Sequence, residues 1–331
     1  MKAAVYRTYG SPDVIRITEV ARPEVADNQV LVEVRATTVT TADWRMRASA
    51  FPGILWLPGR LMVGLFAPGK PVLGAEFSGR VAVVGSKVTR FQVGDEVFGF
   101  AGDGAHAEYL AVGEDAAIAL KPAGLSHDEA AAVPFGGLAA LVFLRDFARV
   151  TPGRKVLVAG ASGGVGVFAV QLARHLGAEV TAVTSTRNLD LVRSLGADHV
   201  VDYTREDYTG AGPVHDVIID TAGTTSFGQA KKALAPRGVY VPLEFGLTEI
   251  FRSLTTAMTG GRKVVIGING DRREDLEYLA GLLERGDLRP VIDSRFPLDR
   301  IADAHRRVEG RHKTGSVVVT VEPPEALRLV A

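Results

Sequence analysis

The sequence predicts an α/β protein in which a doubly wound parallel sheet is joined to a partly open β-barrel. The first observation is a strand, a glycine-rich turn and a helix in succession from Lys155 to Gly177. The second is that apolar strand-like runs alternate with helical patterns after this stretch, whereas short strands separated by turns fill the first 122 residues. A chain of 331 residues also suits two domains of ordinary size.

The stretch from Lys155 to Gly177 predicts a nucleotide-binding turn. Its strand, Lys155 to Ala159, is short and apolar, and apolar residues recur at helical spacing from Val165 onward. Glycines between the two leave the amide groups that open the helix accessible to a pyrophosphate, which the helix dipole also attracts. The usual G-x-G-x-x-G pattern holds only in its last two positions, because Ala161 stands at the first.

A purely structural turn is the alternative, but the strand before it and the βα units after it favour a dinucleotide site. The residues expected to contact the dinucleotide are Ala161, Ser162, Gly163, Gly164 and Val165.

The remaining pattern gives the order of elements. In the first segment we expect strands at Lys2–Tyr6, Val14–Val20, Gln29–Ala36, Val72–Val84, Glu96–Gly99 and Ala107–Ala111. After a helical pattern at Asp128–Val150, buried strands are expected at Val180–Val183, His199–Val201, Val217–Ile219, Val239–Pro242 and Val264–Ile268, with helices at Leu189–Leu195, Phe227–Leu234 and Arg273–Arg285. The chain then reverts to strands at Pro290–Asp293 and Ser316–Val321, around a short helix at Ile301–Glu309, so we expect its end to return to the first domain.

Composition excludes several classes of partner. Lys plus Arg equals Asp plus Glu at 38 each. The sequence contains no block of basic residues that would indicate binding to nucleic acid or to an anionic membrane. No run of about 18 apolar residues occurs and the N-terminus lacks a signal-peptide pattern, so we expect a cytoplasmic protein with a small ligand. The chain has no cysteine, which excludes disulfides, thiolate nucleophiles and thiolate metal ligands.

The chain resembles the medium-chain dehydrogenases/reductases, in their zinc-less quinone and enoyl reductase branch. The stretches that carry the resemblance are MKAAVYRTYG, LGAEFSGRVAVVGSKVTRFQVGDEVFGF, AEYLAV, ASGGVG, SLGADHVVDY, DTAG and LRPVIDSRFPLDRIADAHRRVEGRHKTGSVVVTV. The resemblance implies a GroES-like barrel at 1–122 and 290–331, a Rossmann domain at 123–289, and an active site in the cleft between them.

The zinc ligands of related enzymes are missing from this sequence. Aligning the local motifs places Thr40, Ala75 and Phe135 where zinc-dependent relatives hold the metal with Cys, His and Cys. Without a Lewis acid, oxidation of a simple alcohol is disfavoured, and reduction of an already polarised acceptor is favoured. We therefore expect no metal, and a zinc alcohol dehydrogenase is the disfavoured alternative.

The residues beyond the glycine turn favour NADPH over NADH. An NAD site of this fold places Asp or Glu about 20 residues further on, where it binds the ribose 2′-hydroxyl. Here that position holds Ser185, Thr186 and Arg187, and the first carboxylate is Asp190 in the next helix. Two hydroxyls and a guanidinium suit a 2′-phosphate, although a helix cap would also explain the two hydroxyls. The resemblance places Tyr203 beside the adenosine phosphate.

Two further turns follow strands at the edge where open α/β sheets bind ligands. Asp220–Gly223 follows the fourth strand and Leu243–Gly246 the fifth, so Gly223 and Leu243 are candidate contacts for the nicotinamide ribose. An ordinary turn explains Gly223 nearly as well.

The candidate residues for chemistry lie in the run from Thr37 to Arg45. Thr40 stands where zinc-less relatives commonly have Asn, and its hydroxyl could donate a hydrogen bond to a substrate carbonyl. Arg45 is the alternative electrophile, and Asp43 is expected to orient the loop. Ordinary β-propensity also explains the threonines. Outside this run, His106 is a possible proton donor or a structural residue, and Glu76 is expected to be a hydrogen-bond or ion-pair partner.

The insert from Phe51 to Phe66 is too apolar for a solvated loop. It could line a pocket for a small hydrophobic carbonyl or quinone, or it could pack as a helix against the barrel. The candidate pocket residues are Trp44, Phe51, Trp56 and Phe135.

These observations predict an NADPH-dependent reductase of α,β-unsaturated carbonyls or quinones. A non-catalytic NADPH-binding protein of structural or regulatory use, or an alcohol or carbonyl dehydrogenase, stays open as an alternative. The run Arg262–Asn269 is expected to be the last strand of the sheet, whose exposed edge would pair with its copy in a homodimer. Apolar residues at helical spacing in Leu247–Met258 would cover that interface.

Overall fold

The computed structural model describes the chain except for residues 52, 54–55, 211 and 323–331. It divides into two compact units. The barrel unit comprises Met1–Phe135, Asp271–Gly286 and Pro290–Ala331, and the Rossmann unit comprises Gly136–Gly270 and Asp287–Arg289. Among the described residues, no helix combines the length and the apolar character needed to cross a lipid bilayer.

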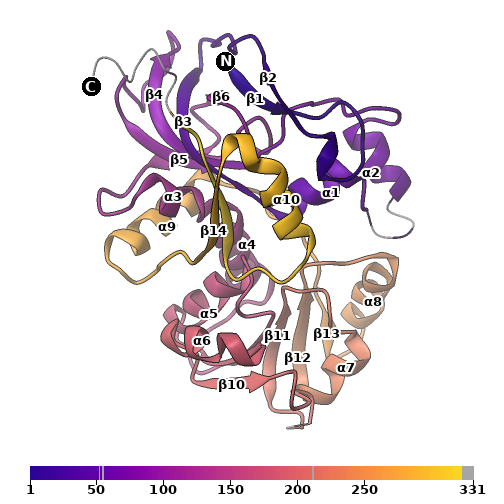
Figure 1. Cartoon of the computed structure of the whole chain (residues 1–331). Coiled ribbons are helices and arrows are strands. Elements are labelled where there is room, and N and C mark those ends of the chain that lie inside the picture. Colours follow the sequence, from indigo (N-terminus) through magenta and orange to yellow (C-terminus); the bar gives the residue numbers. More distant parts are fainter. Residues whose placement is uncertain (52, 54–55, 211, 323–331) are drawn as a thin grey trace. The chain divides into compact units, whose positions relative to one another are not determined.

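The Rossmann unit is built on a parallel sheet. In its described part, six strands follow the order β10-β9-β8-β11-β12-β13 (Figure 1). The strands are β8 (Lys155–Ala159), β9 (Glu179–Thr184), β10 (His199–Asp202), β11 (His215–Asp220), β12 (Leu234–Pro242) and β13 (Lys263–Val264). This is the order of a doubly wound dinucleotide-binding sheet, so the predicted fold class is confirmed for this unit.

Helices alternate with these strands along the chain. They are α4 (Pro134–Val142), which begins in the barrel unit, the π-helical turn η3 (Phe143–Phe147), α5 (Gly166–His175), η4 (Thr186–Asn188), α6 (Leu189–Ser194), α7 (Phe227–Ala233) and α8 (Leu247–Ala257). Because α5 packs on both β8 and β9, every residue from Gly166 to Ala173 is buried. Fixing α5 in this way fixes the glycine turn that precedes it.

The last strand of this sheet is shorter than the sequence predicts. The expected strand at Val264–Ile268 is limited to β13, although β13 does lie at the edge of the sheet. The Val265 amide donates to Tyr240 O at 2.9 Å, and the next donor on β12 would be Pro242. Since proline has no N–H, the parallel ladder ends there.

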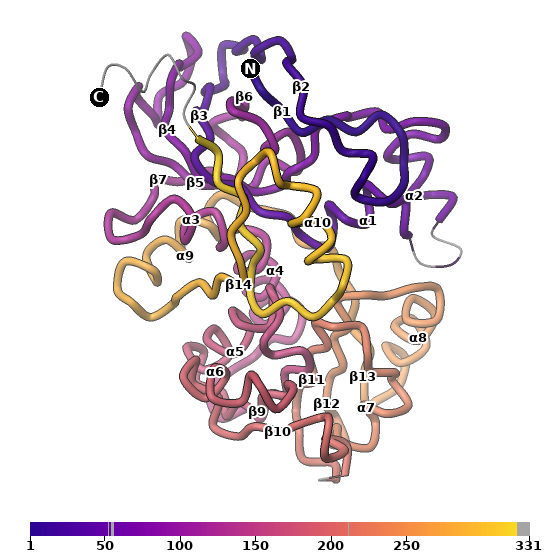
Figure 2. Tube along the Cα trace, in the orientation of Figure 1, coloured from indigo at the N-terminus to yellow at the C-terminus, as the bar shows by residue number. Residues whose placement is uncertain are grey.

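The barrel unit contains a mainly antiparallel sheet in the order β14-β15-β3-β4-β5-β7, with β6 also paired to β3. Its strands are β3 (Gln29–Val39), β4 (Glu76–Val84), β5 (Glu96–Phe100), β6 (Tyr109–Gly113), β7 (Ala117–Leu120), β14 (Ile292–Pro297) and β15 (Ser316–Thr320). The C-terminal strand β15 pairs with β3 of this unit, and Figure 2 shows the yellow C-terminal segment beside the indigo β3. Buried residues such as Val32, Phe77 and Val319 form its core.

The barrel unit also contains a small second sheet and several helices. They are the two-stranded sheet β1 (Lys2–Val5) and β2 (Arg16–Glu19), the short helices η1 (Pro12–Val14) and η5 (Leu298–Arg300), and the helices α1 (Thr41–Ala48), α2 (Trp56–Val63), α3 (His127–Ala131), α9 (Arg273–Glu284) and α10 (Ile301–Glu309).

The division of the chain differs from the expected boundaries at 122 and 289. The first segment of the barrel unit continues to Phe135, because α3 packs on β3 and β4 and Ala132 O accepts a hydrogen bond from Ser316 Oγ at 3.2 Å. Residues 271–286 also belong to the barrel unit, because α9 packs against β7. Sequence periodicity shows where a helix forms but not which sheet it will cover.

Candidate active site

The glycine turn presents backbone donors, as its sequence predicts. The amides of Ser162, Gly164 and Val165 make no hydrogen bond within the described part of the chain, although they open the α5 helix. A side chain at Gly166 would place its Cβ 2.1 Å from Gly160 O, so only glycine allows the helix to begin this close to β8. Three N–H groups at a helix N-terminus suit a pyrophosphate.

Ser162 is held in place by residues that follow the neighbouring strand. Its hydroxyl oxygen accepts hydrogen bonds from Thr184 Oγ1 at 2.8 Å and from Asn188 Nδ2 at 2.9 Å. A hydroxyl has one proton to donate and two lone pairs to accept with, so these bonds leave its proton available for a ligand. Neither Thr184 nor Asn188 was identified from the sequence, because their contact with Ser162 depends on the packing of β8 beside β9.

The structure changes the expected donor set for a 2′-phosphate. Ser185 precedes η4 without making a side-chain cap, so the cap interpretation does not apply to its hydroxyl. The Thr186 hydroxyl instead donates to Asp202 Oδ2 at the end of β10, and only one of the two expected hydroxyls stays available. Arg187 is exposed. Tyr203 is 56% exposed and its amide donates to Thr184 O at 3.1 Å, which places it at the same edge of the sheet.

Asp220 organises the turn after β11. This carboxylate is fully buried, and it accepts from the amides of Ala222 at 3.0 Å, Gly223 at 2.9 Å and Thr225 at 2.8 Å. Burial raises the pKa of Asp220, and these backbone donors counteract the rise. The candidate Leu243 is tied to the same point, because its amide donates to Asp220 O at 3.0 Å.

Thr221 links this turn to the glycine turn. Its hydroxyl is within hydrogen-bond reach of Ala159 O at 2.9 Å and of Gly160 O at 3.1 Å. No local sequence pattern indicates this bridge, which aligns the carboxyl ends of β8 and β11. The candidate cofactor residues of the Rossmann unit therefore lie along one edge of its sheet.

In the barrel unit, Thr40 and Asp43 form a buried capping box at the start of α1. The Thr40 hydroxyl donates to Asp43 Oδ2 at 2.6 Å, and the Thr40 amide donates to the same oxygen at 2.8 Å. The other oxygen, Asp43 Oδ1, accepts from the Gly74 amide at 3.0 Å. Asp43 therefore orients the loop, as expected, and the Thr40 proton is already engaged by it. A substrate carbonyl would have to replace that bond.

A second buried carboxylate, Glu76, joins two other segments. Its Oε1 accepts a short hydrogen bond from the Thr38 hydroxyl, and its Oε2 accepts from the Phe135 amide at 2.6 Å. Burial, opposed by these bonds, raises the pKa of Glu76 to about 7. Phe135 also stacks on Phe100, with ring centroids 6.4 Å apart.

The histidine singled out by the sequence lies against this network. His106 is buried, and its Nε2 lies 2.8 Å from Thr38 O. Its ring meets His305 of α10 edge-on at 5.8 Å, and His305 was missed because nothing in the sequence relates α10 to residue 106. Burial lowers the pKa of both histidines. A neutral His106 bonded to a backbone carbonyl is held as a structural residue.

The candidate pocket residues each have a different partner. Trp44 packs against the barrel core, and the ring of Phe51 lies beside Gly59. Trp56 is 46% exposed, with the Arg60 guanidinium 5.6 Å from its ring. Arg45, on α1, is partly buried.

The apolar insert is only partly as expected. It contains the helix α2, which has no buried residue but contacts Tyr9 of the barrel unit, whose hydroxyl donates to Val63 O at 3.1 Å and whose ring lies 3.8 Å from the Arg60 guanidinium. The expectation of a helix packed on the barrel is therefore met only in part. Ile54 and Leu55 of the insert lie outside the described residues.

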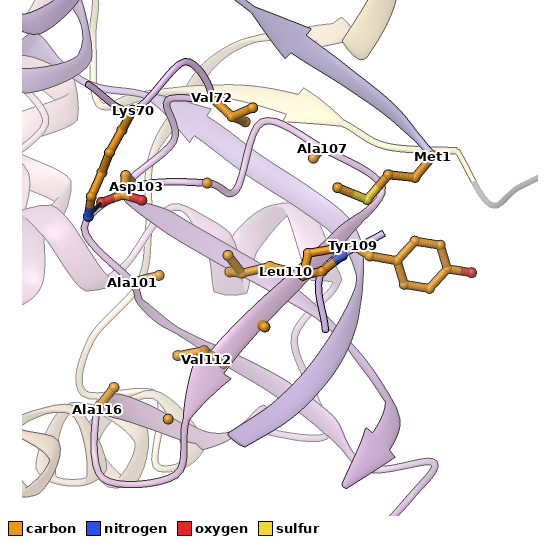
Figure 3. A pocket seen from close by; sticks show the side chains of 14 residues that line it. Met1, Lys70, Val72, Ala101, Asp103, Ala107, Tyr109, Leu110, Val112 and Ala116 are labelled. Atoms are coloured by element: carbon orange, nitrogen blue, oxygen red, sulfur yellow. Dashed lines mark hydrogen bonds and ion pairs between the residues drawn. The ribbon is translucent and has the colours of Figure 1, made fainter. Parts of the chain in front are cut away.

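A separate cavity of about 380 Å³ lies in the barrel unit (Figure 3). Its middle is apolar, with Leu110 and Val112, and the ion pair of Lys70 with Asp103 lies at one end. None of the candidate site residues lines it.

Comparisons with known proteins agree with this geometry. The alcohol dehydrogenase GroES-like domain matches residues 26–146, and the zinc-binding dehydrogenase family matches residues 195–319. The 2-methylene-furan-3-one reductase of Solanum lycopersicum is 36% identical, over 96% of this chain and 79% of its own length. The chain belongs to the medium-chain dehydrogenase/reductase family.

Two further relatives place it in the quinone and enoyl reductase branch of that family. The chloroplastic NADPH-dependent alkenal/one oxidoreductase of Arabidopsis thaliana is 34% identical over 96% of this chain and 79% of its own length. The solved structure of the quinone oxidoreductase from Coxiella burnetii has a TM-score of 0.85 and 31% identity, and the match covers 97% of this chain and 99% of that one.

The zinc of some medium-chain dehydrogenases/reductases does not fit the residues found here. At the three aligned positions, Ala75 and Phe135 have no donor atom in their side chains, and the Thr40 hydroxyl donates to Asp43. Among the described residues, no group of three or more His, Cys, Asp and Glu side chains could hold a metal ion.

We expect His305 to make the protein sensitive to acid. Neither ring nitrogen of His305 has a hydrogen-bond partner in the described part of the chain, and burial holds its pKa well below the ordinary value. The unfolded chain therefore takes up a proton first, and stability is lost as pH falls below about 6.5. Glu76 acts in the opposite sense. Because its pKa is raised in the folded state, the folded protein takes up this proton first, and stability is gained as the pH falls from about 7 to about 4.5.

The substitution His305→Leu should reduce the loss of melting temperature between neutral and mildly acidic pH. Thermal unfolding followed by circular dichroism across this range measures it, with the exposed His199→Leu as control. An unchanged pH dependence in His305→Leu would contradict the assignment.

Proposed function

We propose that this protein transfers a hydride from NADPH to an α,β-unsaturated carbonyl or a quinone, without zinc. The observation that carries the proposal is the pairing of a dinucleotide turn with a barrel unit whose zinc positions hold Thr40, Ala75 and Phe135. Conjugated acceptors are already polarised, so hydride can add to carbon without a Lewis acid. The enone and quinone reductases among its relatives support this substrate class.

On the cofactor side, the chain's own residues bind and orient the dinucleotide. The three amides of the glycine turn suit the pyrophosphate, while Ser185 and Arg187 offer donors to a 2′-phosphate. NADPH supplies the hydride when it is bound. The bond from Thr186 to Asp202 lowers the pKa of Asp202, which keeps a carboxylate near these donors.

On the substrate side, the described residues hold the loops in place but offer few protons to a substrate. Asp43 holds Thr40, and burial keeps His106 neutral at a backbone carbonyl. Developing charge on the substrate oxygen would be met by Arg45, by water or by a reoriented Thr40 hydroxyl. A conjugated substrate spreads this charge over several atoms, so it makes smaller demands on such donors than a simple ketone.

A homodimer is the second part of the proposal. In the part of the chain that the structure describes, β13 ends the sheet with β12 as its only neighbouring strand. The helix α8 exposes Leu247, Phe251 and Leu254 by 52%, 67% and 66%, and Met258, which follows α8, is 90% exposed. A second copy related by a two-fold axis would cover both features together.

Turnover should be found on a panel of enones and quinones with NADPH, and it should survive exhaustive chelation. Loss of cofactor absorbance with each acceptor measures the reaction before and after dialysis against a chelator. Simple alcohols with NADP⁺ serve as the comparison. Binding of NADPH without turnover of any acceptor would favour the non-catalytic alternative, and activity lost together with stoichiometric zinc would contradict the zinc-independent reaction.

NADPH should bind at least about tenfold more tightly than NADH, which corresponds to about 1.4 kcal/mol. The substitution Arg187→Ala should remove most of this difference by weakening NADPH alone, because NADH has no 2′-phosphate for the guanidinium to bind. Fluorescence titration with both cofactors measures it. Equal affinities in the unmodified protein would refute the phosphate clamp.

The substitution Leu254→Glu should convert the dimer to a monomer at micromolar concentration, because it places a charge in the apolar face of α8. The matched control is Val93→Glu, at a valine of the barrel unit that is 62% exposed. Light scattering gives the mass of each variant. A mass near 35.1 kDa for the unmodified protein would rule out the homodimer.

A further inference from the structure

Glu76 occupies an unusual position for a carboxylate that contacts no cation of the described residues at hydrogen-bond distance. It is 1% exposed, at the first position of β4. Its two oxygens accept from two separate segments, the Thr38 hydroxyl near the end of β3 and the Phe135 amide in the first turn of α4. An ionised carboxylate is only an acceptor, so it satisfies both donors at once.

Asp43 makes a parallel connection nearby. It joins Thr40, at the start of α1, to Gly74, which lies next to Ala75. Together the two carboxylates tie residues 38–40, residues 74–76 and Phe135, the three segments in which zinc-dependent relatives carry their metal ligands. In this chain, hydrogen bonds to buried carboxylates hold these segments where a metal would otherwise connect them.

We propose that Glu76 is a positioning residue for hydride transfer, which holds Thr38 and Phe135 in their working places only while its carboxylate is ionised. The proposal rests on the proposed reductase function. A protonated Glu76 has a donor on one oxygen, so it must reverse the bond to the Thr38 hydroxyl or leave one donor without a partner. Either change shifts the end of β3, from which Thr40 and α1 follow.

The charges around Glu76 set the pH at which its carboxylate becomes protonated. Asp43 on α1 raises the pKa of Glu76, whereas Lys313, in the turn before β15, lowers it. Lys313 also interacts with Asp293 and Arg307, and burial lowers its pKa to about 8. With burial as the largest effect, the pKa of Glu76 lies at about 7. Activity should therefore fall as pH decreases through neutrality.

The substitution Glu76→Gln tests the proposal, because glutamine copies the protonated form. Its carbonyl can accept from the Phe135 amide while its NH₂ group donates to the Thr38 hydroxyl. We expect kcat to fall by about tenfold, since misplacement of a reacting group by a fraction of an ångström has effects of this order. The acidic limb of the pH profile should disappear, and KM for NADPH should stay unchanged.

Two further variants separate positioning from general destabilisation. Glu33→Gln is the matched control, because Glu33 is also a buried carboxylate, on the β3 strand that carries Thr38, but it pairs with Arg35 at 3.2 Å and not with Thr38 or Phe135. It should leave the kcat profile unchanged. Lys313→Met removes the positive charge and should move the acidic limb to higher pH.

A fluorescence measurement that needs no turnover tests this proposal separately from the proposed function. In a Trp56→Phe background, Trp44 on α1 is the sole tryptophan, and it packs against the barrel core next to Asp43. Its emission should titrate near neutral pH, and the titration should vanish in Glu76→Gln. If Glu76→Gln keeps the limb and the titration, or if Glu33→Gln matches its effect on kcat, Glu76 is a structural residue only. If no acceptor turns over while the titration is present and depends on Glu76, the proposed function fails. The effect of Glu76 ionisation on the position of Thr38 and Phe135 then still stands.

Discussion

A carboxylate enclosed in a protein must receive hydrogen bonds from the chain, and this requirement shapes the candidate site in both units. Asp43 and Glu76 in the barrel unit and Asp220 in the Rossmann unit are each buried to within 1% of complete enclosure. Leaving such a group without donors would cost several kcal/mol, so the surrounding loops adopt conformations that point N–H and O–H groups at it. Loops fixed in this way present their remaining atoms in defined places.

The two units use this constraint differently. In the Rossmann unit, Asp220 shapes the turn after β11, and Thr221 connects that turn to the glycine turn. The result is a set of backbone and hydroxyl donors suited to an anion. In the barrel unit, Asp43 and Glu76 accept hydrogen bonds from the Thr40 and Thr38 hydroxyls, so these protons are already engaged. That arrangement makes the substrate side rigid but leaves few acidic protons on it.

The sequence was sufficient to predict the elements whose pattern is local. The strand and helix around the glycine turn and the alternation of βα units follow from apolar periodicity and turn residues. The expected role of Asp43 also follows, because Thr40 and Asp43 have the spacing of a capping box. Backbone donors at a helix N-terminus could be anticipated, since they do not depend on side chains.

Features that depend on contacts distant in sequence could not be predicted. The sequence suggests that the Thr186 hydroxyl faces a 2′-phosphate or caps a helix, but Asp202 on a neighbouring strand accepts its hydrogen bond, and no short-range pattern relates these two residues. The length of β13 depends on where Pro242 falls in the register with β12. The exposure of α2 also could not be predicted, because an apolar run shows that cover is favourable but not that the chain itself supplies it.

The distribution of donors limits which substrates the site can reduce. Hydride addition creates negative charge on the substrate oxygen, and one well-placed hydrogen bond there lowers the barrier by about 3 to 4 kcal/mol. A metal would supply more, but Ala75 and Phe135 have no atom to bind one, and the Thr40 proton is shared with Asp43. In an enone or quinone the incoming charge spreads over the conjugated system before any donor acts. The loss of metal ligands and the choice of a conjugated acceptor are therefore two consequences of the same chemistry: a site with ordered but weakly acidic donors can assist only a substrate that stabilises its own product anion.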